Sequence, residues 1–188
     1  DRRGFGQSSK VATGYDYDTF ADDLAAVLEA LDLTDVILVG FSMGTGELAR
    51  YVRRHGAERV ARLAFLGSLE PGMLGQGLPQ SQFDGIAQAA KADRFAWFTQ
   101  FYADFYNLDE TLGTRISQEV VTASWITAIG SAPVAAYAVV PSWIEDFADD
   151  VAAVRASGIP ALIVHGTADR ILPIDATGRP FHAAFPEA

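Results

Sequence analysis

One segment, Val36 to Gly46, constrains the fold of this 188-residue chain more than any other. Its first four residues are apolar, they lead directly into Gly-Phe-Ser-Met-Gly at residues 40–44, and a helical pattern follows from Glu47 to Arg54. A strand, a tight turn and a helix in that order are the context that a Gly-x-Ser-x-Gly elbow requires. Glycine is expected at positions 40 and 44, because a side chain at either would collide with the neighbouring strand or helix.

Ser42 is the candidate nucleophile of this turn. The turn holds the serine in a strained backbone conformation, with its hydroxyl at the N-terminus of a helix, where partial positive charge favours a developing oxyanion. The alternative is a glycine-rich strand-to-helix turn that contains serine by chance. The apolar strand before the motif and the helix after it favour the catalytic interpretation.

The rest of the chain alternates strands and helices. Val36–Val39 is short, apolar and β-branched, as parallel strands covered on both faces are. Val60–Leu66 and Ala161–Val164 are predicted as the second and third strands. Alternation of this kind predicts an α/β fold with a mostly parallel sheet and helices on both faces.

Three helices are predicted around these strands. The first covers Tyr17–Leu31, with Asp18 or Thr19 as its N-cap. The helix after Ser42 ends at Gly56, where glycine suits the left-handed position. The last covers residues 175–185, unless Gly178 and Pro180 delay its start.

A long section of different composition separates the second and third strands. Residues 73–82 are rich in Gly, Pro and Gln and are predicted to be a linker, and residues 83–144 hold several aromatic-rich helical patterns. An ordinary helical core is one interpretation, since Trp97, Phe101 and Phe105 recur on one face. A large insertion favours a cap over the carboxyl ends of the strands, where open parallel sheets bind ligands. We expect core at residues 1–73, a helical cap at 74–145 and core again at 146–188.

Asp169 is the candidate partner acid. It lies in the loop after the third strand, so it is expected at the same rim of the sheet as Ser42. A carboxylate there can orient an imidazole and stabilise the imidazolium that forms when serine is deprotonated. The alternative is a turn-forming aspartate that bonds its own backbone.

None of the three histidines is a good candidate for the base. His165 precedes the acid in sequence and is expected to make structural hydrogen bonds at the end of its strand. His55 is expected at the far end of the helix after Ser42, roughly 15 Å or more from that serine at about 1.5 Å per residue. His182 is expected to face solvent.

Composition excludes several other functions. The net charge of −10 argues against nucleic acid and anionic membranes as partners, because both attract positive surfaces. No apolar run is long enough to cross a bilayer. Absence of cysteine excludes disulfides and thiolate metal sites, and no two histidines share a helix at ligand spacing, so no metal centre is expected. We expect a cytoplasmic protein that binds a small molecule, with a homo-oligomer left open.

Four stretches together carry a resemblance to a known family. They are residues 1–8 (DRRGFGQS), 15–24 (YDYDTFADDL), 39–44 (VGFSMG) and 165–173 (HGTADRILP). With these stretches the chain resembles the α/β-hydrolases of the cofactor-free haloperoxidase group, which includes non-haem chloroperoxidases, perhydrolases, aryl esterases and some γ-lactamases. The resemblance implies an α/β-hydrolase fold, with Ser42 as nucleophile, Asp169 as triad acid and the Met43 backbone N–H as one oxyanion donor.

The sequence also departs from that family. The family's catalytic histidine follows a further strand after the last helix, and no such histidine is present here. The loop that supplies the second oxyanion donor is likewise missing, as are the first strands and the last strand. We therefore expect an internal segment of a longer enzyme.

Two functional classes remain open. The first is a serine hydrolase that forms an acyl-enzyme from a small ester, amide or lactam and passes the acyl group to water or to hydrogen peroxide. With a short carboxylic acid and peroxide, such an enzyme makes a peracid that oxidises halide without a cofactor. The second is an α/β-hydrolase-fold binding protein, or an inactive fragment, that keeps the pocket but lacks the base.

Overall fold

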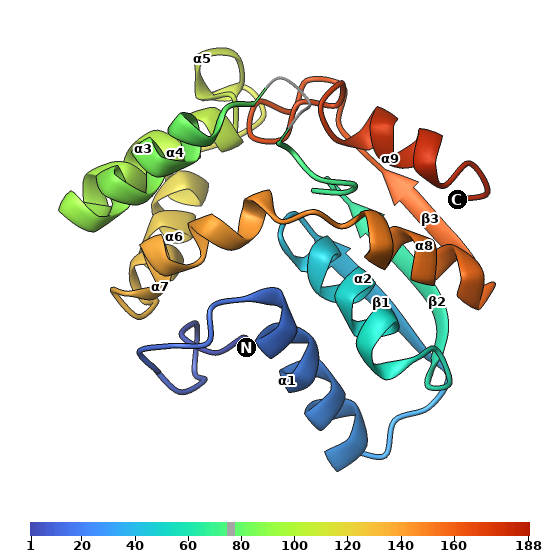
Figure 1. Cartoon of the computed structure of the whole chain (residues 1–188). Helices are drawn as coiled ribbons and strands as arrows, with labels where there is room; N and C mark the ends of the chain where they lie inside the picture. Colours follow the sequence, from blue (N-terminus) through green and yellow to red (C-terminus); the bar gives the residue numbers. More distant parts are fainter. Residues whose placement is uncertain (75–77) are drawn as a thin grey trace. The chain divides into compact units, whose positions relative to one another are not determined.

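The computed structural model describes residues 1–74 and 78–188, which form two compact units (Figure 1). One unit contains residues 16–79 and 142–188 and holds the sheet. The other contains residues 1–15 and 80–141 and is helical. None of the helices formed by the described residues is long and apolar enough to span a membrane.

The sheet has three parallel strands in the order β1-β2-β3. They are β1 (Val36–Phe41), β2 (Val60–Leu66) and β3 (Ala161–Val164). The predicted bounds of β2 and β3 are confirmed, and β1 is two residues longer than predicted. Apolar, β-branched runs bounded by glycine or proline gave enough signal to find all three strands.

Helices cover one face of this sheet. The cross-strand register places Leu38 beside Leu63, and Gly40 beside Phe65, so these residues share a face. Leu63 and Phe65 belong there to one buried apolar cluster with residues of four helices: α1 (Tyr17–Ala30), α2 (Gly44–His55), α8 (Ala148–Ser157) and α9 (Gly178–Ala184). Figure 1 shows α1, α2 and α8 lying side by side, and the ring of Phe181 on α9 packs edge-on against Phe65.

The opposite face of the sheet is apolar and exposed in the described chain. Ile37 and Val39 on β1 are 62% and 60% exposed, and Leu162 and Val164 on β3 are similarly open to solvent. The prediction that Val36–Val39 is covered on both faces is therefore wrong for the residues described. The continuous apolar run indicated a buried strand, but periodicity alone does not identify what covers each face.

Two helix ends differ from the prediction. Asp16, rather than Asp18 or Thr19, is the N-cap of α1, because its backbone is extended and its carboxylate accepts a hydrogen bond from the Thr19 N–H at 2.8 Å. Asp18 is instead bonded to two arginines of α2. The last helix starts at Gly178, so the alternative of a delayed start is the one confirmed.

The helical unit has its own packing. It contains α3 (Gln80–Ala92), α4 (Arg94–Phe105), α5 (Leu108–Thr111), α6 (Gln118–Ile129) and α7 (Ala135–Ala138), and the short 3-10 helix η1 (Val140–Ile144) begins at its end. The rings of Trp97, Phe101 and Phe105 contact one another along α4, as their spacing predicted, although Phe98 is the residue of α4 that is buried. The linker predicted for residues 73–82 includes 75–77, which lie outside the described residues, and its last three residues already belong to α3.

Candidate active site

Ser42 lies in the strained turn that the sequence predicted. Its φ is +53°, a left-handed conformation that a non-glycine residue rarely adopts. Its N–H donates to the Leu66 carbonyl at 2.9 Å, which ties the turn to the end of β2. A Cβ added at Gly40 would lie 2.6 Å from the Gly44 carbonyl oxygen, so glycine at position 40 permits this close approach.

Thr45 secures the turn from the helix side. Its N–H donates to the Ser42 carbonyl at 2.9 Å, and its hydroxyl donates to the same oxygen at 2.7 Å. The Thr45 hydroxyl oxygen in turn accepts from the Leu69 N–H at 3.2 Å. Sequence analysis missed this residue, although a threonine three positions after a turn residue is well placed to bond back to its carbonyl.

Asp169 lies at the same rim of the sheet as the elbow. A Cβ added at Gly67, the residue after β2, would lie 3.7 Å from both the Asp169 Oδ2 and the Phe41 ring. The carboxylate and the residue before Ser42 therefore border the same point. Asp169 Oδ1 accepts from the N–H groups of Ile171 and Leu172 at 2.9 and 2.8 Å, so the predicted turn-forming contact is also present.

His165 has the structural role that was expected. Its side chain is almost fully buried, and its Nε2 lies 2.7 Å from the Leu172 carbonyl. Because a carbonyl only accepts, Nε2 must carry the proton. The ring also explains Gly178, where a Cβ would lie 2.7 Å from the His165 Cγ.

The other two histidines are His55, the last residue of α2, and His182 on α9. His55 Nε2 lies 2.8 Å from Asp22 Oδ1, and its ring stacks on Tyr51. His182 is exposed on α9. Within residues 1–74 and 78–188, no hydrogen bond joins a histidine ring to Ser42.

The Met43 N–H lies at the start of α2. Met43 is the N-cap residue, with φ −55° and ψ −21°, and its N–H follows the strained serine directly. The N–H groups at a helix start have no partner within the helix, which leaves them available to an anion. This position agrees with the oxyanion role that the family resemblance implies for Met43.

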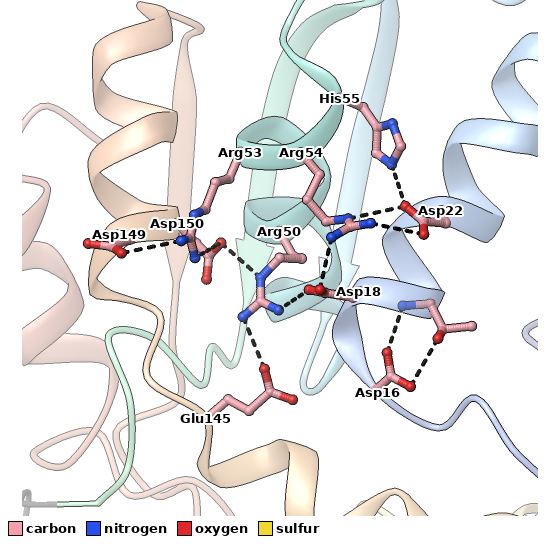
Figure 2. Close-up of polar contacts among 11 residues, drawn as sticks. Asp16, Asp18, Asp22, Arg50, Arg53, Arg54, His55, Glu145, Asp149 and Asp150 are labelled. Atoms are coloured by element: carbon pink, nitrogen blue, oxygen red, sulfur yellow. Dashed lines mark hydrogen bonds and ion pairs between the residues drawn. The ribbon is translucent and has the colours of Figure 1, made fainter.

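Figure 2 shows a cluster of charged groups along α2, the helix that follows the elbow. Arg50 of α2 is buried, and its guanidinium bonds Asp150 at 2.9 Å, Glu145 at 3.0 Å and Asp18. Burial lowers the pKa of Arg50, but the bonds with Asp150 and Asp18 outweigh burial and hold the pKa above its usual range. Arg50 of α2 thus bonds α1, α8 and the residue that follows η1 through one permanent charge.

Glu70 is a second group that sequence analysis missed. It follows β2 by four residues and is fully buried. Burial raises the pKa of its carboxyl from 4.5 to about 7. Nothing in the sequence around Glu70 signals this burial, because it depends on packing against distant segments.

No group of three or more His, Cys, Asp or Glu side chains in the described part of the chain is arranged to hold a metal ion.

Comparison with known proteins places these features in a family. The profile of the alpha/beta hydrolase fold family matches residues 1–188. A non-heme haloperoxidase of Rhodococcus erythropolis is 42% identical over 185 residues, covering 93% of this chain and 65% of the relative. A bifunctional esterase/perhydrolase of Acinetobacter calcoaceticus is 33% identical over 190 residues, covering 95% of this chain and 66% of the relative.

A solved structure also matches this chain. The crystal structure of a bromoperoxidase from Bacillus anthracis matches with a TM-score of 0.92 and 33% identity, covering all of this chain and 69% of that one. The chain thus spans about two-thirds of the length of the proteins it matches. Together the profile, the relatives and the shared fold show that this chain belongs to the alpha/beta hydrolase fold family.

Proposed function

We propose that the natural full-length protein is a serine hydrolase in which Ser42 attacks the carbonyl of a small ester, amide or lactam. The observation that carries this proposal is the left-handed Ser42 at φ +53°, between a strand end and a helix start. Backbone strain of this kind persists where the surrounding structure enforces it, and it recurs at catalytic sites. Attack by the Ser42 hydroxyl would release the leaving group and form an acyl-enzyme.

Asp169 and Met43 have supporting roles in this proposal. The Asp169 carboxylate would orient a histidine base and stabilise its charged form. The Met43 N–H would donate to the oxyanion that develops on the attacked carbonyl.

Peroxide is a second acyl acceptor in this scheme. Water attacking the acyl-enzyme releases the carboxylic acid, whereas hydrogen peroxide releases the peracid, and either restores the Ser42 hydroxyl. The peracid then transfers its terminal hydroxyl oxygen, with its proton, to bromide or chloride, giving hypohalous acid and the carboxylate of the original acid. The haloperoxidase and esterase/perhydrolase names of two relatives support testing both acceptors.

A binding protein with an incomplete triad is the alternative. It is favoured by one observation, that no histidine ring of the described chain bonds to Ser42. Such a protein would keep the pocket and bind small esters without turning them over. A histidine supplied from outside these 188 residues would favour the enzyme instead.

The test is covalent labelling of the natural full-length protein by a fluorophosphonate, followed by peptide mapping. We expect the label on Ser42, and we expect Ser42→Ala to lose both the label and turnover of p-nitrophenyl acetate. Ser81→Ala, which changes an exposed serine on α3, is the matched control and should behave as wild type. Turnover retained in Ser42→Ala would refute the nucleophile, and ester binding without labelling would favour the binding protein.

The substrate class is tested with the same preparation. Short aryl esters, a bicyclic γ-lactam, and acetate with hydrogen peroxide and bromide distinguish hydrolysis from perhydrolysis.

A further inference from the structure

Glu70 is a buried acid that the proposed mechanism does not use. Its residue is 0% exposed, and neither carboxyl oxygen makes a hydrogen bond with another residue in the described part of the chain. The hydroxyl of its neighbour Ser68 is buried and unpaired in the same way. A buried polar group without a hydrogen bond is costly, so one expects the carboxyl to remain neutral or to find a partner when it ionises.

Thr45 is the polar side chain of α2 that lies next to this carboxyl. It is close enough to Glu70 to lower the pKa of the carboxyl, yet the hydroxyl donates its one proton to the Ser42 carbonyl. Its oxygen already accepts from the Leu69 N–H. A hydroxyl has a single proton to donate, so it cannot serve the Ser42 carbonyl and an ionised Glu70 together.

The charges around Glu70 also favour its neutral form. Asp150 of α8 is fully buried, and its negative charge adds to burial in raising the pKa of Glu70 to about 7. The Glu70 and Leu69 backbone N–H groups and Thr45 lower that pKa. Arg50 and Arg53 of α2 bond the Oδ1 atom of Asp150, and Glu145, the residue after η1, bonds Arg50. The nearby cations are therefore bonded to other carboxylates.

We propose that protonated Glu70 is a positioning residue for Ser42, because it leaves the Thr45 hydroxyl on the Ser42 carbonyl. When Glu70 ionises, its carboxylate competes for the Thr45 proton, the Ser42 carbonyl loses one of its two bonds from Thr45, and the left-handed turn is held less firmly. Glu70 acts through Thr45 and does not touch the substrate. This inference rests on the proposed role of Ser42.

The experiment compares the natural full-length protein with Glu70→Gln across a pH series from about 5.5 to 9.5, on either side of the Glu70 pKa. Glutamine keeps the shape of the neutral acid but cannot ionise. The readouts are the rate of fluorophosphonate labelling and kcat/KM for p-nitrophenyl acetate. We expect the ratio of Glu70→Gln to wild type to start near one in acid and to rise about threefold to tenfold in base, the effect of one hydrogen bond. Taking a ratio cancels the histidine titration that both proteins share.

Variants of Thr45 and Glu145 test whether the rise of this ratio with pH depends on the Thr45 hydroxyl. Thr45→Val should be slower at every pH and should remove the difference between Glu70 and Gln, whereas Thr45→Ser should restore it. Glu145→Gln removes a carboxylate from the same charge cluster without touching Thr45, so its pH profile should follow wild type. A flat ratio for Glu70→Gln, or a rise that survives in Thr45→Val, would overturn the proposal.

An activity-independent readout separates this inference from the proposed function. The backbone amide signals of Ser42 and Leu69 should titrate with Glu70 in wild type and remain constant in Glu70→Gln. If Ser42→Ala kept full turnover, the nucleophile assignment would fail while this titration still decided the coupling of Glu70 to the turn. Absence of the titration, with labelling intact, would overturn the coupling alone. If Glu70→Gln does not fold, the amide titration in Thr45→Val against Thr45→Ser gives the same decision.

Discussion

Replacing Arg50 by methionine should destabilise the protein strongly. Methionine fills a similar volume but removes the guanidinium that bonds three carboxylates (Figure 2). Asp18 and Glu145 are partly exposed and can be solvated by water, whereas the Asp150 side chain is 0% exposed and keeps only the longer Arg53 contact at 3.5 Å. Removing one partner of a buried pair costs about 3–5 kcal/mol, and the remaining Arg53 contact favours the lower end of that range.

Thermal and urea unfolding of the natural full-length protein at neutral pH measure this effect. A loss of about 3 kcal/mol corresponds to a melting temperature lower by roughly 6–12 °C in a domain of this size. Arg53→Met is the matched control. Its partner Asp149 is largely exposed, and its other partner, the buried Asp150, keeps the Arg50 bond at 2.9 Å, so the change should cost about 0–1 kcal/mol. Adding Asp150→Asn to Arg50→Met should recover part of the loss, since no buried charge is then left unpaired. Equal effects of Arg50→Met and Arg53→Met would refute the reasoning.

Three further predictions concern the site and the chain itself. Asp169→Asn should leave the circular dichroism spectrum unchanged, because Oδ1 of the new side chain can still accept from the N–H groups of Ile171 and Leu172. It should lower ester turnover by on the order of ten-thousand-fold. A loss under about tenfold would point to another carboxylate. Because Glu70 is protonated more readily in the folded state, the free energy of unfolding should fall by on the order of 3 kcal/mol as pH rises from 4.5 to about 7. The free energy of unfolding of Glu70→Gln, measured over the same pH range, should not show this fall. The 188-residue chain expressed alone should show no serine-dependent turnover of p-nitrophenyl acetate, since losing the base costs as much as losing the serine. Light scattering should show that it aggregates through the exposed apolar face that includes Ile37 and Val39. A folded, monomeric, active chain would contradict both expectations.

The strands and the elbow could be predicted from sequence because their signals are local. Val60–Leu66 and Ala161–Val164 are apolar runs with glycine or proline at their borders, and the Gly-x-Ser-x-Gly turn requires its strand and helix within a dozen residues. The N-cap of α1 was misplaced by two or three residues because Asp16, Asp18 and Thr19 can all cap a helix. The tertiary bonds of Asp18 to Arg50 and Arg54, which draw Asp18 away from the cap, are not visible in the sequence. Glu70 was missed because its burial, and the Asp150 charge of α8 that adds to its raised pKa, depend on tertiary packing that no local pattern encodes.

Asp169 shows why two sequence interpretations need not exclude each other. A turn-forming aspartate and a triad acid were opposed as alternatives, yet the carboxylate has two oxygens that face different groups. Oδ1 closes the turn by accepting two backbone N–H groups, while Oδ2 borders Gly67 at the rim that also holds the elbow. The turn fixes the rotation of the carboxylate, and Oδ2 also lies 3.8 Å from the His165 Nε2. Under the proposed function, the structural bonds of Asp169 are therefore what orients it for catalysis.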